Sequence, residues 1–184
     1  MVFDSGSDSD LHALGRLGVT MIAWLTTVTP EGQPQTFPVW YLWEHGEVLL
    51  YSDRRARRNA NLAVNPRVSF HLDSNPEGGD VIVLEGEARF DPATPPVTEN
   101  GAYLAKYGTW IQDFLESSEK MAETYNVAIR IRPTRGRHSG GEGSREAAWV
   151  LDGGSRSRRV PSGSGRSRWR DPRSTPSPTR SRAA

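Results

Sequence analysis

Four arginines lie close together in the segment YSDRRARRNANLAVNP, which spans residues 51–66: Arg54, Arg55, Arg57 and Arg58. Guanidinium groups hydrogen-bond phosphate oxygens bidentately, and a hydroxyl or the amides of a helix start can complete such a site. Ser52 offers the hydroxyl, and Asn61 offers a neutral donor one turn later. The cluster therefore indicates an anion site. The alternative on charge pattern alone is a solvated surface balanced by Asp53 and nearby glutamates.

Residue types that carry nucleophilic or metal chemistry give no second candidate. The chain has no cysteine, and its four histidines show no metal-ligand spacing. No Ser-His-Asp set, catalytic carboxylate pair, Walker loop or G-x-G-x-x-G stands out, so hydrolysis and phosphoryl transfer have no support. We assign no catalytic side chain and no metal ligand. Binding groups without a nucleophile suit hydride transfer, in which a cofactor carries the reactive carbon.

The elements that would position the arginines are mostly short strands. Runs rich in β-branched and aromatic residues, separated by turn residues, predict six strands, at 20–29, 34–43, 47–52, 67–72, 80–90 and 126–133. Gly86 predicts a bulge or bend in the fifth. Because closure removes exposed edges, the predicted fold class is mainly β, a six-stranded antiparallel split barrel with peripheral helices.

Helical spacing is predicted in three segments around these strands. Leucines at positions 11, 14 and 17 share one face of a short helix that Asp8 or Asp10 would cap. Further helices are expected over residues 55–64 and 97–125. The apolar face of the last segment consists of Tyr103, Leu104, Tyr107, Ile111, Phe114 and Leu115.

Composition changes sharply near Gly136. Residues 1–135 hold 12 Lys and Arg against 18 Asp and Glu, a net charge of −6, whereas residues 136–184 hold 11 against 4, a net charge of +7. We predict a flexible N-terminus at 1–9, a barrel domain at 10–135 and a disordered tail rich in Arg, Ser, Gly and Pro at 136–184. Two explanations of the tail stay open, a frameshift in a GC-rich gene or a genuine basic segment that contacts acidic partners.

Partners and location follow from the same composition. An acidic barrel domain argues against nonspecific nucleic-acid binding, except through the basic tail. The N-terminus MVFDSGSDSD lacks the features of a signal or transit peptide, and no run approaches the ~18 apolar residues of a membrane span. We expect a cytoplasmic protein with no membrane contact.

The ordered short segments of residues 10–135 resemble the pyridoxamine 5'-phosphate oxidase-like split-barrel family, which is similar to FMN-binding proteins. In that family a tyrosine and a hydroxyl residue precede a basic pair and an Asn-Pro, here Tyr51-Ser52, Arg57-Arg58 and Asn65-Pro66. The chain is most similar to the actinobacterial branch that uses the deazaflavin coenzyme F-420. That likeness rests on IAWLTTV at 22–28, PVW at 38–40, YS at 51–52, Arg58, Asn61, NPRV at 65–68 and AYLAKY at 102–107.

The resemblance implies a homodimer with two cofactor sites at the subunit interface. The residues that it places at the phosphate and the flavin-like ring are Phe37, Pro38, Val39, Trp40, Ser52, Arg54, Arg57, Arg58 and Asn61. Arg58 stands where the family usually has lysine, which keeps the charge but changes a point ammonium into a planar fork. The substrate-side candidates are Tyr41, Tyr103, Lys106 and Tyr107.

For several of these residues the alternative is an ordinary structural position, on the surface or in the core, with no role in binding. On an amphipathic helix Lys106 is more often a surface lysine. Aromatic residues in strands are usually core, which we expect for Trp24. Trp40 and Tyr41 point to opposite faces of their strand, so one is expected in the core and the other in a cleft.

Three functions are therefore expected. The first is an F-420-dependent oxidoreductase that transfers a hydride from the reduced deazaflavin to an unsaturated small molecule. The second is an FMN-binding oxidase or reductase, because the same basic strand end would hold a flavin phosphate. The third is a noncatalytic barrel that binds or stores a cofactor or lipid-like ligand.

Overall fold

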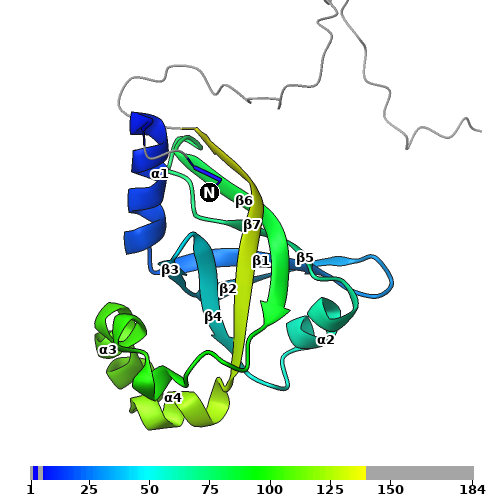
Figure 1. Cartoon of the computed structure of the whole chain (residues 1–184), viewed down its shortest axis with the longest axis vertical. Helices are drawn as coiled ribbons and strands as arrows, with labels where there is room; N and C mark the ends of the chain where they lie inside the picture. Colours follow the sequence, from blue (N-terminus) through cyan, green and yellow to red (C-terminus); the bar gives the residue numbers. More distant parts are fainter. Residues whose placement is uncertain (1, 4–5, 140–184) are drawn as a thin grey trace, which may run out of the picture. The chain divides into compact units, whose positions relative to one another are not determined.

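The computed structural model describes residues 2, 3 and 6–139 of the chain. Four consecutive strands follow the first helix, and three consecutive helical elements precede the last strand (Figure 1). The helices and strands are α1 (Asp8–Val19), β1 (Ile22–Val28), β2 (Pro34–Trp40), β3 (Leu42–Glu44), β4 (Glu47–Ser52), α2 (Arg57–Val64), β5 (Arg67–His71), β6 (Val81–Phe90), the 3-10 helix η1 (Val97–Glu99), α3 (Gly101–Leu115), α4 (Ser118–Thr124) and β7 (Val127–Ser139). None of the helices in the described part is both long enough and apolar enough to span a membrane.

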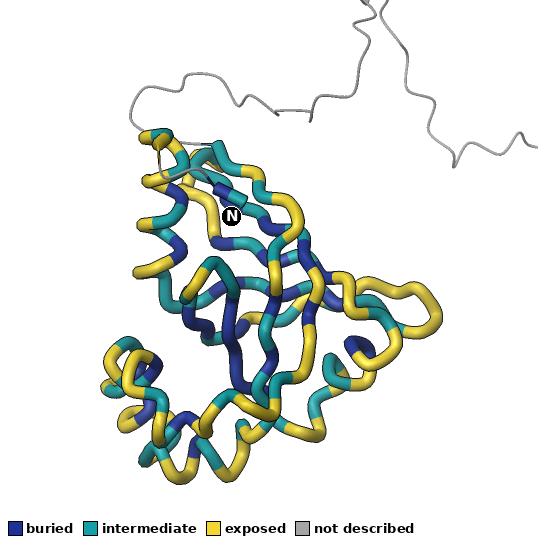
Figure 2. The backbone as a smooth tube through the Cα atoms, viewed as in Figure 1, coloured by how far each residue is buried: buried dark blue, intermediate teal, exposed yellow. Residues whose placement is uncertain are grey.

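The strands form one antiparallel sheet with the order β2-β1-β5-β6-β7-β4-β3. The sheet curls around a core to which the strands contribute alternate residues, such as Ala23 and Leu25 of β1. Figure 2 shows these buried positions along the strands, with exposed residues on the helices and loops. The predicted fold class, a mainly β antiparallel split barrel with peripheral helices, is confirmed.

The described part has seven strands where six were predicted, because the expected strand 34–43 divides at Tyr41. Trp40 pairs with Ile22 of β1, whereas Leu42 pairs with Leu49 of β4, at the other end of the sheet. Tyr41 therefore has no strand partner for its backbone. Its N–H donates to the Tyr107 hydroxyl at 2.8 Å, and this hydroxyl donates to the Tyr41 carbonyl at 2.8 Å. One phenol thus satisfies the backbone where the chain crosses between the sheet ends.

The helices differ from the prediction in their caps and faces. The side chain of Ser7, not Asp8 or Asp10, caps α1 by accepting from the Asp10 N–H. On the predicted apolar face of that helix Leu17 is buried, but Leu11 is 49% exposed. The segment 97–125 breaks into η1, α3 and α4 instead of one continuous helix.

The long strands β6 and β7 carry the bulge that was predicted at Gly86. Their register shifts between Glu85 and Gly86, and a Cβ at Gly86 would lie 2.6 Å from the Arg132 carbonyl oxygen. Only glycine allows this approach without movement of the backbone. The prediction of a bulge at this position is confirmed.

Both predicted boundaries of the barrel domain lie inside ordered structure. β7 pairs with β6 as far as Ser139, four residues past the expected end at 135. Phe3, placed in the predicted flexible N-terminus, is 4% exposed and packs edge-on against His138 at 5.4 Å. The rest of the predicted tail, residues 140–184, lies outside the described residues.

Candidate functional site

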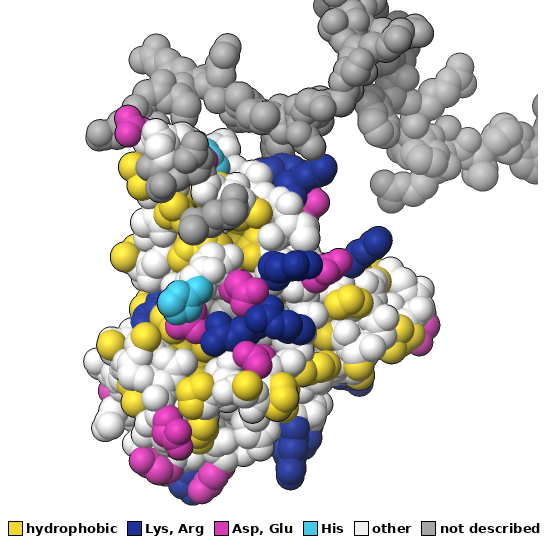
Figure 3. Space-filling view, viewed as in Figure 1, with side chains coloured by type: hydrophobic (Ala, Val, Ile, Leu, Met, Phe, Trp, Pro, Cys, Tyr) yellow, Lys and Arg dark blue, Asp and Glu magenta, His cyan; other side chains and the backbone are white. Residues whose placement is uncertain are grey.

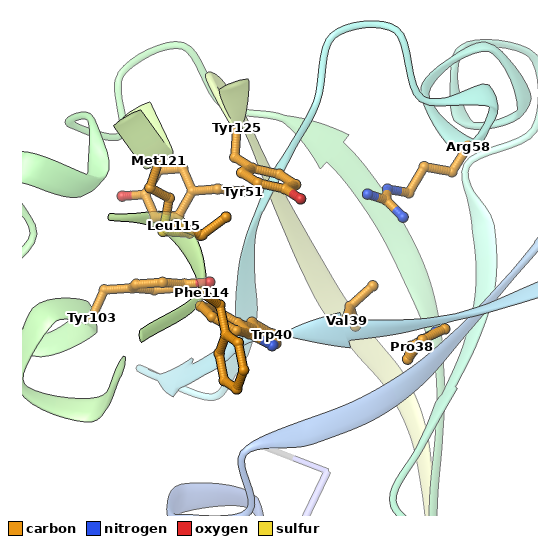
Figure 4. Close-up of a pocket in the computed structure, with 10 residues that line it drawn as sticks. All are labelled: Pro38, Val39, Trp40, Tyr51, Arg58, Tyr103, Phe114, Leu115, Met121 and Tyr125. Atoms are coloured by element: carbon orange, nitrogen blue, oxygen red, sulfur yellow. The ribbon is translucent and has the colours of Figure 1, made fainter. Parts of the chain in front are cut away.

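A pocket of about 320 Å³ lies between the end of β2, the end of β4, α2 and the α3–α4 pair (Figure 4). Its walls are aromatic or aliphatic, and one side chain that lines it is charged. The lining residues are Pro38, Val39, Trp40, Tyr51, Arg58, Tyr103, Phe114, Leu115, Met121 and Tyr125. Such a pocket suits a planar, largely apolar molecule that carries an anionic group.

The strand β4 contributes Tyr51 to the pocket. Both faces of this strand are buried. Leu50 belongs to the core inside the curled sheet, whereas Leu49 and Tyr51 belong to a second apolar cluster with α3 and α4. The Tyr51 hydroxyl donates to the Pro95 carbonyl at 2.8 Å and accepts from Asn100 Nδ2 at 3.1 Å. This second cluster fixes the aromatic wall of the pocket.

Arg58 provides the positive charge at one side of the pocket. It lies in the first turn of α2, and its Nε donates to Ser52 Oγ at 2.8 Å, which orients the guanidinium. Desolvation of the half-buried guanidinium lowers the pKa of Arg58. Within the described part of the chain no carboxylate forms an ion pair with Arg58. A desolvated, unpaired guanidinium of this kind is stabilised by binding an anion.

A stack of aromatic rings leads from the protein interior to the pocket rim. Trp40 lies parallel to the buried Tyr107 ring at 5.0 Å and meets Trp110 edge-on at 5.5 Å. Trp110 in turn contacts Phe114 at 6.1 Å, and Phe114 is 70% exposed. Phe114 was predicted to lie on the apolar face of its helix, and its exposure at the pocket corrects that prediction.

Of the nine residues predicted to bind a cofactor, four line the pocket: Pro38, Val39, Trp40 and Arg58. Ser52 is fully buried behind Arg58 and donates to Asn59 Oδ1 at 2.9 Å. The Asn61 amide is buried too, and its Nδ2 donates to Thr27 Oγ1 at 2.9 Å and to Gln35 Oε1 at 3.1 Å. Both side chains therefore hold the site together from outside the pocket.

The remaining three predicted cofactor residues do not line the pocket either. Phe37 is half-buried on β2. Arg54 and Arg57 are exposed beside Arg58 at the start of α2, and neither forms an ion pair within the described residues. The neighbouring Arg55 is already paired with Asp53 at 2.9 Å.

The substrate-side candidates separate into one pocket residue and three residues outside it. Tyr103 lines the pocket. Tyr41 is fully buried and donates to the Leu17 carbonyl at 2.9 Å, while Tyr107 is committed to the backbone of Tyr41 and Met21. Lys106 is half-buried, with its Nζ 3.1 Å from the Tyr41 carbonyl and 4.1 Å from the centre of the Tyr41 ring. Its position is not that of a free surface lysine.

Of two predictions about aromatic residues, the one for Trp40 and Tyr41 is confirmed and the one for Trp24 is wrong. Trp40 lines the pocket while Tyr41 lies in the core, which confirms that the pair divides between cleft and core. Trp24 is not core: it is half-buried on the other side of β1 from Leu25, and its Nε1 donates to Asp73 Oδ1 at 2.7 Å.

Sequence reasoning missed five residues of the lining: Tyr51, Phe114, Leu115, Met121 and Tyr125. Tyr51 had been quoted only as part of the resemblance, and the other four come from the end of α3 and from α4 or the residue after it. The available signal was the helical spacing of apolar residues in segment 97–125. Phe114 and Leu115 had been assigned to the apolar face of that segment, but this face had not been linked to the site.

A Ser-His-Asp set, which the sequence did not suggest, occurs away from the pocket. His138 Nδ1 lies 3.1 Å from Ser9 Oγ, and His138 Nε2 lies 2.5 Å from Asp10 Oδ1. None of the three residues lines the pocket. We interpret the set as the contact that holds the first turn of α1 against the end of β7.

Comparison with known proteins agrees with this architecture. A solved structure of an F-420 reductase aligns with a TM-score of 0.53 at 21% identity, over 67% of this chain and 94% of that chain. An FAD-binding protein from Mesorhizobium loti aligns with a TM-score of 0.53 at 19% identity, over 71% of this chain and 94% of that chain. The heme storage protein HutZ from Vibrio cholerae aligns with a TM-score of 0.53 at 14% identity, over 73% of this chain and 96% of that chain. These likenesses show the fold. No curated protein sequence matches the chain.

A family model gives the assignment that structural likeness alone does not. The model described as pyridoxamine 5'-phosphate oxidase matches residues 20–140, which is well over half of the chain and contains β1 through β7 and the whole pocket. The chain therefore belongs to the pyridoxamine 5'-phosphate oxidase family.

Proposed function

We propose that the chain is an oxidoreductase that binds coenzyme F-420, or alternatively FMN, in the pocket between β2, β4, α2 and the α3–α4 pair. The observation that carries the proposal is the Arg58 guanidinium, desolvated and without a carboxylate partner among the described residues, at the side of an aromatic pocket. Both cofactors combine a planar ring with a phosphate, so both match this pairing of charge and apolar wall.

The residues present fit such a cofactor in a defined way. Arg58 would bind the phosphate, and Ser52 would hold the guanidinium in position through the 2.8 Å hydrogen bond. The exposed Arg54 and Arg57 are candidates for further phosphate contacts. Pro38, Val39 and Trp40 of β2 would contact the ring, with Trp40 fixed by its stack on Tyr107.

When bound, such a cofactor supplies a hydride from its ring to an unsaturated acceptor. The protein's part is to bind and orient the two molecules and to exclude water, which the apolar lining favours. The reduction also requires a proton on the acceptor, and this proton would come from water, because no carboxylic acid, histidine or lysine is among the residues that line the pocket. The preference for F-420 over FMN rests on the segments that resemble the F-420-using branch, and the F-420 reductase of the same fold supports it.

We further infer a homodimer. The exposed Phe114 leaves an apolar surface beside the pocket that a second copy would cover. Sedimentation velocity would show a dimer at micromolar concentration; a monomer would contradict this part of the proposal.

Parallel titrations of the full chain with F-420, FMN and heme test the cofactor class. Quenching of tryptophan fluorescence reports binding because Trp40 lines the pocket and Trp110 contacts Trp40. Micromolar or tighter binding of F-420, with weaker binding of FMN, is expected. Preference for FMN would support a flavin oxidoreductase instead. Preference for heme, or binding of none of the three, would contradict an oxidoreductase of this kind and favour a noncatalytic barrel.

A further inference from the structure

The Tyr103 hydroxyl stands out among the polar groups of the described residues. It is the one buried side-chain nitrogen or oxygen there without a hydrogen-bond partner. Aromatic rings surround the Tyr103 side chain. The centre of its ring lies 5.0 Å from the centre of the Tyr51 ring, which meets it edge-on, and 4.8 Å from the centre of the Tyr107 ring. Native proteins rarely leave such a group unpaired, because a buried hydroxyl without a partner costs free energy. The exception calls for a partner that the described residues do not provide.

The two neighbouring tyrosines show that the local structure can satisfy a phenol. The Tyr51 hydroxyl bonds to the Pro95 carbonyl and to Asn100, and the Tyr107 hydroxyl bonds to the backbone of Tyr41 and Met21. Tyr103 comes from the same helix as Tyr107, one turn earlier. Its unpaired state is therefore specific to its position and not a property of the whole cluster.

That position is in the wall of the pocket. Tyr103 lines it, and Figure 4 shows the ring extending from α3 with the hydroxyl directed toward Trp40 and Phe114. Arg58 lies on the opposite side of the pocket in the same view. A ligand that fills the space between them would meet a cation at one end, aromatic walls that include the Tyr125 phenol along its length, and the Tyr103 hydroxyl at the other end.

We propose that the Tyr103 hydroxyl donates a hydrogen bond to a carbonyl oxygen of the substrate, so that the pocket selects planar, conjugated carbonyl compounds. The inference rests on the proposed function in treating the pocket as the place where the substrate binds. Burial raises the pKa of Tyr103 well above its usual value, so the hydroxyl stays protonated and remains a donor near neutral pH. A carbonyl oxygen is the matching acceptor, whereas a hydrocarbon of equal shape leaves the hydroxyl unpaired.

Two probes of nearly equal size test this without redox chemistry. 2-Acetylnaphthalene carries a conjugated carbonyl, and 2-ethylnaphthalene has two hydrogen atoms in place of its oxygen. Calorimetric titration of the full chain, without cofactor, is expected to show the ketone binding about 10-fold more tightly, as one neutral hydrogen bond in a dry pocket provides. Tyr103→Phe should reduce this ratio to about 1 by weakening ketone binding alone.

Two control variants separate this role from a structural one. Tyr51→Phe removes a hydroxyl from the same pocket wall, and Tyr107→Phe removes one from the same helix, but both of these hydroxyls already have partners. Both variants are expected to keep the ketone preference, and Tyr107→Phe to melt at a lower temperature. Tyr103→Phe, which removes an unpaired hydroxyl, should melt no lower than the wild type.

Four results would overturn the assignment: equal binding of the two probes by the wild type, binding of neither, an unchanged ratio in Tyr103→Phe, or a clearly lowered melting temperature in that variant. Repeating the titration with F-420 or FMN at saturation distinguishes substrate from cofactor. Ketone binding that persists supports a substrate contact, whereas displacement of the ketone would assign the hydroxyl to a cofactor carbonyl and contradict the substrate role. Because the probes carry no phosphate, a chain that fails to bind either cofactor can still give the predicted ketone preference.

Discussion

Lys106 was expected to be a surface lysine, but the structure places it against Tyr41, and its contacts there explain its chemistry. Its ammonium is half-buried over the Tyr41 ring and donates to the Tyr41 carbonyl. Burial lowers the pKa of Lys106 from the ordinary 10.5 to about 8, even though the ring and the carbonyl favour the charged form. At neutral pH part of the population is therefore neutral, which makes this amine unusually reactive for a lysine.

The titration of Lys106 is directly measurable because the chain has two lysines, Lys106 and Lys120. Reductive methylation with ¹³C-formaldehyde followed by NMR is expected to show one lysine signal with a midpoint near 8. Lys106→Met identifies the signal by its loss. A midpoint at the ordinary value of 10.5 would contradict the buried environment.

The same shift has a defined consequence for stability. Between pH 8 and 10.5 the unfolded chain holds a proton on Lys106 that the folded chain has released, so the free energy of unfolding rises with pH across this window. Below pH 8 the buried charge lowers stability. Chemical denaturation of wild type and Lys106→Met at pH 7.5 and 10 should therefore show the variant gaining less from the rise in pH.

At the scale of secondary structure, the bulge in β6 is the feature whose cause is clearest. Gly86 lies opposite the Arg132–Pro133 backbone, and a Cβ there would come within 2.6 Å of a carbonyl oxygen. The bulge lets the two long strands β6 and β7 stay paired while the sheet bends, and β7 pairs on its other edge with β4. The bulge therefore depends on the lack of a side chain at Gly86.

Substitution of two glycines by alanine tests this account. Gly86→Ala is expected to lower the free energy of unfolding by ~1–3 kcal/mol, because the backbone must shift to admit the methyl group. Gly108 in α3 has no atom within 4 Å of its Cβ position, so Gly108→Ala should raise stability by ~0.5–1 kcal/mol through helix propensity. Urea unfolding measures both. A neutral Gly86→Ala would show that the strands do not approach as described.

Element prediction from sequence succeeded where a local pattern decides the structure and failed where distant pairing decides it. Alternation and turn residues predicted β1, β4, β5 and β6 closely, and Gly86 marked its bulge. The break at Tyr41 was missed because it depends on Tyr107, 66 residues away, which takes the place of a strand partner. The end of β7 was missed because its composition resembles the tail, although pairing with β6 extends it to Ser139.

For the candidate site, the same limit applies. The strand-borne residues Pro38, Val39 and Trp40 and the helix-borne Arg58 could be predicted from the resemblance. The residues contributed by the end of α3 and by α4 could not, because the positive φ of Glu116 turns the chain between these helices and redirects their side chains. Ser52 and Asn61 are buried outside the pocket, where they bond to other side chains of the protein. Residue type alone does not tell whether a polar side chain contacts a ligand or supports the residues that do.

At the scale of the whole molecule, the outer surface over β6 and β7 is held together by charge. Figure 3 shows basic and acidic side chains interleaved on this face. The ion pairs there include Arg89–Glu47 at 2.8 Å, Arg130–Glu44 at 3.0 Å and Arg137–Glu85 at 2.6 Å. Because these pairs connect β3, β4, β6 and β7, they add modestly to the cohesion of the curled sheet, as partly exposed pairs do.

This charged face predicts a loss of stability in acid. The hydrogen bond from Arg89 lowers the pKa of Glu47, so the stability that its carboxylate contributes is present above its ordinary pKa of 4.5 and is lost as pH falls below that value. Calorimetric melting of wild type and Glu47→Gln should show a lower melting temperature for the variant at pH 7 and a gap that closes toward pH 3. A gap independent of pH would show that the ion pair contributes nothing.

The central claim is that Arg58 binds the phosphate of a flavin-like cofactor, and the most direct test compares cofactors that differ only in that phosphate. Dissociation constants for FMN and riboflavin, and for the deazaflavin of F-420 with and without a 5'-phosphate, would be measured for wild type, Arg58→Gln and the control Arg55→Gln, whose arginine is exposed and paired with Asp53. We expect the wild type and the control to prefer the phosphorylated form by about 10- to 100-fold, the value of one charged hydrogen-bond pair, and Arg58→Gln to lose most of that preference. An undiminished preference in Arg58→Gln would contradict the assignment of the phosphate site to Arg58.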